Sequence, residues 1–115
     1  MADCLFCKIV AGEIPAKIVK RSDTALAFRD IDAKAPVHVL VIPTRHIAAV
    51  RDATGMEGER LLGSLFRFAA DVAKDLGLDA DGYRVVTNTG KNAGQSVDHL
   101  HLHVLGGRKF TWPPG

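Results

Sequence analysis

The sequence predicts an α+β fold in which one long helix covers a mainly antiparallel sheet of about five strands. Five short segments are rich in β-branched or alternating apolar residues, and one segment of about twenty residues has helical periodicity. Most links between the strand segments are too short for parallel crossovers, which need about a dozen residues or more. The chain, residues 1–115, is therefore expected to form a single domain of one sheet and one covering helix.

The elements follow one another along the chain with clear stop signals. A short helical turn is expected over residues 5–11, ended by Gly12 and Pro15. Strands are expected at residues 16–20, 24–29 and 37–42, with a turn at 21–23 and a stop at Pro43. The last two strands are expected at residues 83–88 and 99–105.

The long helix is predicted between residues 56 and 76. Thr54 with Glu57 fits a capping box, and Gly77 fits a left-handed stop. Apolar side chains recur at three- and four-residue steps and form one stripe. The stripe is predicted to be core that lies on the sheet, and its members are Leu61, Leu62, Leu65, Phe66, Ala69, Val72, Ala73 and Leu76.

Composition and charge exclude several classes of protein. The formal net charge is +2, and lysines and arginines are scattered, so the basic stripe of a nucleic-acid binder is absent from the sequence. No apolar run approaches the ~20 residues that span a membrane. The first ten residues lack the pattern of a secretory signal. We expect a cytoplasmic protein that binds neither nucleic acid nor membrane.

The stretch DHLHLHVLGG, residues 98–107, places three histidines on a two-residue period. In a strand, His99, His101 and His103 would share one face while the apolar residues between them pack on the other. Three adjacent imidazoles favour a metal, a phosphate or a proton-transfer partner. The alternative is a half-exposed strand with an accidental metal-chelating patch.

Cys4 and Cys7 are the two cysteines of the chain and form a C-x-x-C pair. Such a pair in a reducing compartment is usually redox-active or metal-binding. A thioredoxin-like redox motif would normally follow a strand, and none precedes this pair. The position therefore favours metal.

The loop NTGKNAGQS, residues 88–96, separates the last two strands. It is neither a Walker A loop nor a G-x-G-x-x-G loop. Its glycines, Gly90 and Gly94, would let backbone amides approach an anion, and Gln95 and Ser96 add side-chain donors. The alternative is a solvated hairpin loop. In either case Ser96 is delivered beside the histidine strand, where a hydroxyl could protonate a leaving group.

These motifs together resemble the histidine triad family. AGQSVDHLHLHVLGG and the terminal WPPG are similar to its Hint branch, and the resemblance extends to FCKIVAGEIPAK, AFRDI and APVHVLVIPTRH. The resemblance implies a nucleotidyl hydrolase or transferase that acts on the α-phosphate of purine nucleotide conjugates. A purine nucleoside phosphoramidate would release AMP or GMP.

The resemblance also assigns catalytic roles. It makes His101 the nucleophile, which forms a covalent nucleotidyl-imidazole that water then hydrolyses. His103 and the loop around Gly94, Gln95 and Ser96 would hold the phosphate oxygens. Ser96 would help to donate a proton to the leaving amine.

The nucleoside contacts are carried over in the same way. Asp30 would accept hydrogen bonds from ribose, and Ile31 with Phe6 would form part of the slot for the base. Asn88 matches a further polar contact near ribose and phosphate, while Asp32 is interpreted as a solvated turn residue. Trp112 matches a residue that reaches towards the partner subunit's site, so the resemblance implies a homodimer with the long helix and last strands near its two-fold axis.

The resemblance implies a zinc site as well. Chiefly microbial members use their C-x-x-C pair with the histidine of P-x-x-H and the first triad histidine. The matching residues are Cys4, Cys7, His46 and His99, which would form a closed, structural site for zinc. His38 is either a hydrogen-bond partner behind the triad, to His103, or merely structural. Asp98 has no assigned role.

Three other functions are compatible with these residues. The histidines could bind a catalytic zinc that activates water. The chain could be a nucleotide-binding or scaffold dimer whose hydrolysis is incidental. It could also be a dinucleoside polyphosphate hydrolase like the Fhit branch, which lacks the frame GQS…WPPG.

Overall fold

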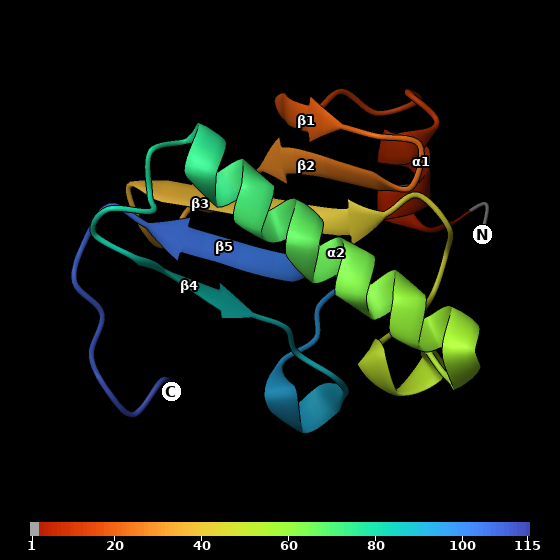
Figure 1. Ribbon diagram of the computed structural model, residues 1–115. Helices are drawn as coiled ribbons and strands as arrows, with labels where there is room; N and C mark the ends of the chain where they lie inside the picture. The colour runs from red at the N-terminus through yellow and green to blue at the C-terminus, as the bar shows by residue number, and fades with distance from the viewer. Residues whose placement is uncertain (1–2) are drawn as a thin grey trace.

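The computed structural model describes residues 3–115 and has an α+β architecture built on one five-stranded sheet (Figure 1). The strand order is β1-β2-β3-β5-β4, and all four pairings are antiparallel, as predicted. The strands are β1 (Ile18–Arg21), β2 (Ala25–Arg29), β3 (Val37–Pro43), β4 (Tyr83–Val86) and β5 (Leu102–Gly106). The helices are α1 (Leu5–Val10), α2 (Gly55–Asp75) and two short 3-10 turns, η1 (Val50–Asp52) and η2 (Lys91–Ala93).

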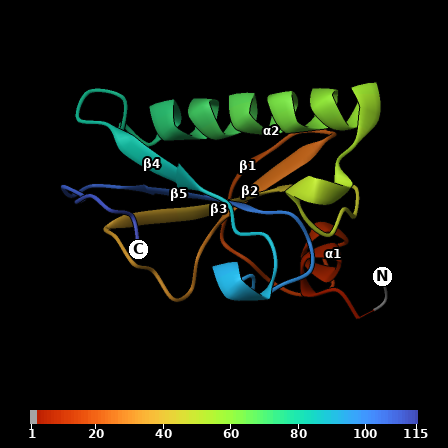
Figure 2. The same ribbon diagram turned by 90° about the horizontal axis from the view of Figure 1, so that it is seen from below.

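The long helix α2 covers one face of the sheet (Figure 2). Its buried side chains pack on residues of β2, β3 and β5 that point to the same face. This core includes Leu65, Phe68, Ala69, Val72 and Ala73 of the helix and Ala27, Val41, Leu102 and Val104 of the sheet. The predicted covering helix is therefore confirmed.

The opposite face of the sheet carries a smaller apolar cluster under α1. Phe6 and Ile9 of the helix pack on Leu26, Phe28, Leu40 and Ile42 of the sheet. Leu26 and Phe28 alternate with Ala25 and Ala27, which belong to the helix-covered core, as the two-residue period of a strand requires. This second face is where the histidines lie.

The last strand begins later than predicted. β5 starts at Leu102 and not at His99, because the backbone groups of residues 99–101 bond outside the ladder: the carbonyl of His99 accepts from the His101 ring, the amide of Leu100 donates to Ile47, and the carbonyl of His101 accepts from Thr87. The predicted alternation nevertheless holds, since Leu100, Leu102 and Val104 are all in the helix-covered core. The strand predicted to reach residue 88 ends at Val86.

The long helix differs from the prediction in two details. Thr54 is its N-cap residue, but the Thr54 side chain makes no capping bond, and Glu57 instead pairs with Arg45 at 2.6 Å. The predicted capping box is therefore wrong. Phe66, predicted as core, is 46% exposed, and Phe68 is buried in the helix-covered core. Gly77 has a φ of 76°, as the predicted left-handed stop requires.

No helix within residues 3–115 is both long enough and apolar enough to cross a membrane.

Two glycines of α2 give a matched test of this packing. A Cβ at Gly58 would clash with the backbone carbonyl group of Ala53, whereas a Cβ at Gly63 would have no neighbour within 4 Å. We expect Gly58→Ala to lower the free energy of unfolding by about 1–3 kcal/mol through overpacking. Gly63→Ala should raise it by about 0.5–1 kcal/mol through helix propensity. Urea unfolding of both variants measures the difference, and equal effects would contradict the packing at Ala53.

Candidate active site and metal cluster

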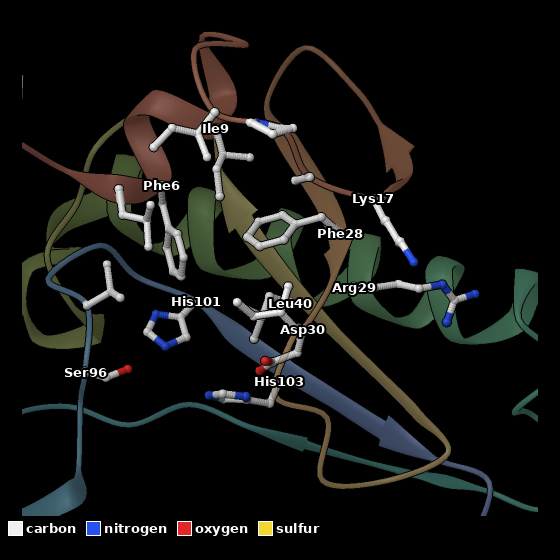
Figure 3. Close-up of a pocket in the computed structure, with 16 residues that line it drawn as sticks. Phe6, Ile9, Lys17, Phe28, Arg29, Asp30, Leu40, Ser96, His101 and His103 are labelled. Atoms are coloured by element: carbon white, nitrogen blue, oxygen red, sulfur yellow. The ribbon is translucent and has the colours of Figure 1, made fainter.

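A cavity of about 810 Å³ opens on the sheet face opposite α2 (Figure 3). One part of its wall is apolar and is made by Phe6, Ile9, Phe28 and Leu40 together with the exposed side chain of Ile31. The other part is polar and contains Asp30, Ser96, His101 and His103. The cavity can therefore take a ligand that has a flat apolar group at one end and an anionic group at the other.

His101 is held in one orientation by its backbone and aromatic neighbours. Its Nδ1 donates to the carbonyl of His99 at 2.7 Å, and the hydroxyl of Thr87 donates to the carbonyl of His101 at 2.9 Å. The ring packs edge-on against Phe6, with centroids 5.1 Å apart. A neutral imidazole whose proton is on Nδ1 keeps a free lone pair on Nε2, which is what a nucleophile or a base requires.

His103 lies against His38, which is buried behind it. Leu40 is opposite His103, and His38 is opposite Leu105, so the two histidines are diagonal neighbours on one sheet face. His38 Nε2 is 2.9 Å from His103 Nδ1 and 3.3 Å from Asp30 Oδ2. Of the two roles left open for His38, the hydrogen-bond partner of His103 is therefore the one that the structure shows.

Burial keeps the two histidines uncharged at neutral pH. It lowers the pKa of His103 to about 4, with the neighbouring His101 and His38 acting in the same direction and Asp30 opposing them. Burial also lowers the pKa of His38, and the Asp30 carboxylate opposes that shift. Both rings therefore act as neutral hydrogen-bonding groups in the cavity wall.

The loop between β4 and β5 brings Ser96 to the cavity and is held in place by Gln95. The Gln95 carbonyl accepts from the amide of Gly90 at 2.9 Å, and its NH₂ donates to the carbonyls of Ala48 and Val97 at 2.7 and 3.1 Å. Ser96 points its hydroxyl to the side of the cavity where His101 and His103 lie (Figure 3). The Gln95 side chain thus shapes the loop that presents Ser96.

The predicted nucleotide-binding residues fall into two groups. Asp30, Ile31, Ser96, His101 and His103 line the cavity, as does Phe6. Asn88, Gly94, Gln95 and Trp112 are not among its lining residues, and Trp112 is 81% exposed. Asp98 is exposed on the surface. Asp32 is also exposed, where it pairs with Lys34 and continues a turn that begins at Asp30, in line with its interpretation as a turn residue.

The four predicted metal ligands form a cluster at the start of α1. Cys4 Sγ lies 3.4 Å from His99 Nδ1, and Cys7 Sγ lies 3.6 Å from His99 Nδ1 and 3.3 Å from His46 Nδ1. His99 is fully buried, and its Nε2 donates to the carbonyl of Pro43 at 2.9 Å. This bond leaves the Nδ1 lone pair directed at the two sulfurs, as in histidines that bind metals. The cluster can hold one metal ion.

The cysteine pair has the properties of metal ligands more than those of a redox couple. Burial raises the pKa of the Cys7 thiol, and the neighbouring Cys4 acts in the same direction. The thiolate both attacks disulfides and binds metals, so this shift does not distinguish the two roles; the imidazoles of His99 and His46 that face the sulfurs do, and they indicate a metal site. In addition, Cys4 caps α1 by accepting from the amide of Cys7 at 3.4 Å, so the pair is part of the local fold.

Two contacts of the site have no signal in the sequence. The hydroxyl of Thr87 fixes the backbone of His101, and the backbone amide of Lys34 donates to His38 Nδ1 at 3.0 Å. Both depend on the way in which distant backbone segments meet. A single sequence does not contain that information.

Comparison with known proteins shows which family contains this site. The HIT domain family matches residues 11–110. An uncharacterized HIT-like protein of Synechocystis is 51% identical over 113 residues, which cover 98% of this chain and 97% of that protein. The chain therefore belongs to the HIT (histidine triad) family.

Solved structures place the fold in the same family. A HIT family hydrolase from Legionella pneumophila superposes with a TM-score of 0.94 at 49% identity, covering 98% of this chain and all of that one. A histidine triad nucleotide-binding protein from Candida albicans gives a TM-score of 0.82 at 32% identity, covering 98% of this chain and 85% of that one. The five-stranded antiparallel sheet with one long helix is thus the fold of HIT proteins.

Removal of a ligand side chain tests the metal cluster. We expect wild type to bind one divalent metal ion per chain and to melt at a higher temperature with the ion than after chelation. Cys7→Ser should lose both the bound ion and that shift, because it removes a sulfur that faces two imidazoles. Elemental analysis and thermal melts measure the two effects. Full metal content in Cys7→Ser would show that the ion binds elsewhere.

The buried histidines predict how stability depends on pH. Between the folded pKa of His103, about 4, and its ordinary value of 6.5, the unfolded chain binds more protons than the folded one. The free energy of unfolding of the metal-free protein should therefore be largest above pH 6.5 and fall as the pH decreases towards 4. Burial of His38 and His99 acts in the same direction.

Urea unfolding at a series of pH values measures this dependence. His103→Asn should reduce the slope between pH 6.5 and 4, since it removes one of the groups that titrate. A slope that is zero in wild type, or equal in the two proteins, would contradict the burial of neutral His103.

Proposed function

We propose that the chain is a nucleotidyl hydrolase of the Hint branch, which cleaves the P–N bond of purine nucleoside 5′-phosphoramidates and releases AMP or GMP. The observation that carries the proposal is the state of His101 in the cavity wall. Its Nδ1 is committed to the carbonyl of His99, so Nε2 is the ring nitrogen left to attack phosphorus. His103 and Ser96 line the same end of the cavity.

The cavity supplies a place for each part of such a nucleotide. The purine fits the apolar part of the wall that contains Phe6, Phe28 and Ile31. Asp30 lines the same cavity beside His103 (Figure 3), where its carboxylate can accept from ribose hydroxyls. The phosphate then meets His103 and Ser96. The predicted contacts of Asn88, Gly94 and Gln95 rest on the family resemblance alone, because these residues are outside the cavity lining and the amides of Gly94 and Gln95 donate to the carbonyls of Lys91 and Gly90.

The reaction proceeds in two displacements at phosphorus. The lone pair of His101 Nε2 forms a bond to the α-phosphorus, the P–N bond breaks, and the leaving nitrogen takes a proton that Ser96 helps to deliver. Water then attacks the nucleotidyl-histidine, the electron pair of the P–Nε2 bond returns to His101, the proton that water loses replaces the one that Ser96 gave up, and the nucleoside monophosphate leaves. His103 and the backbone around Ser96 hold the phosphate oxygens through both steps.

The relatives support this class of reaction. The Legionella protein is described as a hydrolase and the Candida protein as nucleotide-binding, and both descriptions fit a cavity that ends in histidines. In this reaction the imidazole is the nucleophile, so none of the steps requires a metal-bound water. The proposal differs from the zinc-hydrolase alternative in that respect.

Zinc is the metal we propose for the cluster of Cys4, Cys7, His46 and His99. A tetrahedral Zn²⁺ bound to a thiolate and an imidazole separates sulfur from nitrogen by about 3.5 Å. The separations here are 3.3, 3.4 and 3.6 Å. With four protein ligands the site is closed, so the zinc would hold α1 against the segment before β5.

The proposal also includes a homodimer, in the cytoplasm, of a single nucleotide-binding domain formed by residues 1–115. Trp112 supports the dimer, because it is 81% exposed on the tail that follows β5. A side chain of that size at the surface is suited to contact a second subunit. The purine nucleotide conjugate is the proposed small-molecule partner.

The experiment is the release of AMP from adenosine 5′-phosphoramidate. Wild type should turn the substrate over, and His101→Ala should lose several orders of magnitude, because the variant lacks the group that both displacements use. Asp98→Asn is the matched control beside the triad, and it should keep most of the activity because Asp98 is exposed and outside the cavity lining.

Two further measurements separate the alternatives. A trapped adenylyl-histidine together with turnover that survives chelation would exclude a metal hydrolase. Tight binding of AMP without turnover of any phosphoramidate would instead identify a nucleotide-binding scaffold. Activity retained by His101→Ala would overturn the assignment of the nucleophile.

A further inference from the structure

A chain of hydrogen bonds links the loop between β2 and β3 to the cavity. The amide of Lys34 donates to His38 Nδ1 at 3.0 Å. On the far side of the same ring, His38 Nε2 lies 2.9 Å from His103 Nδ1. The loop itself is fastened by Arg108, whose guanidinium donates to the carbonyl of Lys34 at 3.0 Å. These contacts connect a backbone amide to a histidine of the cavity wall.

The direction of each bond follows from the first one. A backbone N–H only donates, so His38 Nδ1 must accept and cannot carry a proton. Burial lowers the pKa of His38, so the ring is neutral and its one proton is on Nε2. Two N–H groups cannot face each other at 2.9 Å, and therefore His103 Nδ1 accepts. The single proton of neutral His103 is then on Nε2.

We propose that the backbone amide of Lys34 is a positioning group, which through His38 fixes His103 as the tautomer with its proton on Nε2. This inference rests on the proposed function, in which His103 holds a phosphate oxygen. A phosphate oxygen only accepts, so the ring is useful there when it presents an N–H. His101 has the opposite arrangement, with its proton on Nδ1 and the lone pair on Nε2.

His101 and His103 therefore have different roles because their rings are opposite tautomers. His101 offers a lone pair and His103 offers a proton, although their ring centroids are 5.1 Å apart and both line one cavity. One backbone carbonyl fixes the first ring, and one backbone amide fixes the second through His38. The fold therefore sets the different roles of His101 and His103, and neither role requires a charged histidine.

The hydrogen bonds of His38 also argue against metal binding at a second group of potential ligands. Asp30, His38 and His103 have donor atoms within 4.8 Å of one another and by composition could hold an ion. A metal at His38 Nε2 would require the proton to move to Nδ1, where the Lys34 amide already donates. Asp30 Oδ2, at 3.3 Å, is placed as a second acceptor of the His38 Nε2 proton.

The tautomers can be observed directly by NMR. Long-range ¹H–¹⁵N correlation spectra of the ¹⁵N-labelled, zinc-loaded protein distinguish the two neutral forms of each histidine. We expect both His38 and His103 to carry their protons on Nε2 and His101 to carry its proton on Nδ1. A His103 ring with its proton on Nδ1 would overturn the inference, whatever the activity of the protein.

Replacement of one residue in two ways tests the amide itself. Lys34→Pro removes the N–H, whereas Lys34→Ala removes the same side chain and keeps the N–H. Relative to Lys34→Ala, we expect Lys34→Pro to lower kcat on adenosine 5′-phosphoramidate by at least about tenfold, with KM changed by less than about twofold. The His38 and His103 signals should move away from the pure Nε2–H positions in Lys34→Pro alone.

Failure of the inference can be distinguished from failure of the proposed function. Equal kcat and equal imidazole spectra in the two Lys34 variants would overturn the role of the amide, while wild-type turnover would still support the function. Absence of turnover in wild type, with the predicted tautomers present, would overturn the function alone. If Lys34→Pro does not fold, as judged by circular dichroism, His38→Phe takes its place, because it breaks the link between the amide and His103, and an unchanged His103 spectrum in that variant would overturn the inference.

Discussion

The antiparallel pairing of β3 with β5 is the constraint on which the site depends. Its register sets Leu40 opposite His103 and His38 opposite Leu105, which brings the two histidines into contact on the sheet face away from α2. Where β3 ends, the carbonyl of Pro43 receives the ring of His99 and so directs that ring at the cysteines. A shift of this pairing by one residue would send His103 of β5 into the helix-covered core.

The metal cluster and the cavity both contact the helix α1, which is only six residues long. Cys4 and Cys7 face the cluster, and Phe6 between them packs edge-on against His99 and His101, with centroids 5.9 and 5.1 Å apart. The wall of the cavity is therefore in contact with the residues that can bind the metal. His99 belongs to both, since its ring points at the cysteines and its carbonyl receives His101. An ordered metal cluster therefore helps to order the cavity wall through these contacts, although the metal itself would not enter the cavity.

The fold could be predicted from the sequence because each element has its own local signal. Apolar periodicity identified the helix to within a residue at each end, and β-branched runs identified the strands. The start of β5 was misplaced because the backbone groups before Leu102 bond to the His101 ring, Ile47 and Thr87 outside the ladder, and such bonds have no periodicity. For the site, motif resemblance selected Asp30, Ile31, Ser96, His101 and His103, which line the cavity, and also Asn88, Gly94, Gln95 and Trp112, which do not. The bonds made by Gln95, Thr87 and the Lys34 amide depend on segments that are remote in sequence, so no local pattern encodes them.

The large sequence separations within the site have a consequence for the order in which the molecule folds. The hairpins β1–β2 and β2–β3 join residues that are close in sequence and can form early. The contact of His38 with His103 spans 65 positions, and that of Cys4 with His99 spans 95. Closing loops of that size is slow and entropically costly, so these contacts form late. A nascent or partly folded chain is therefore expected to have its two N-terminal hairpins and α2 before β5 pairs with β3 and brings the imidazoles together.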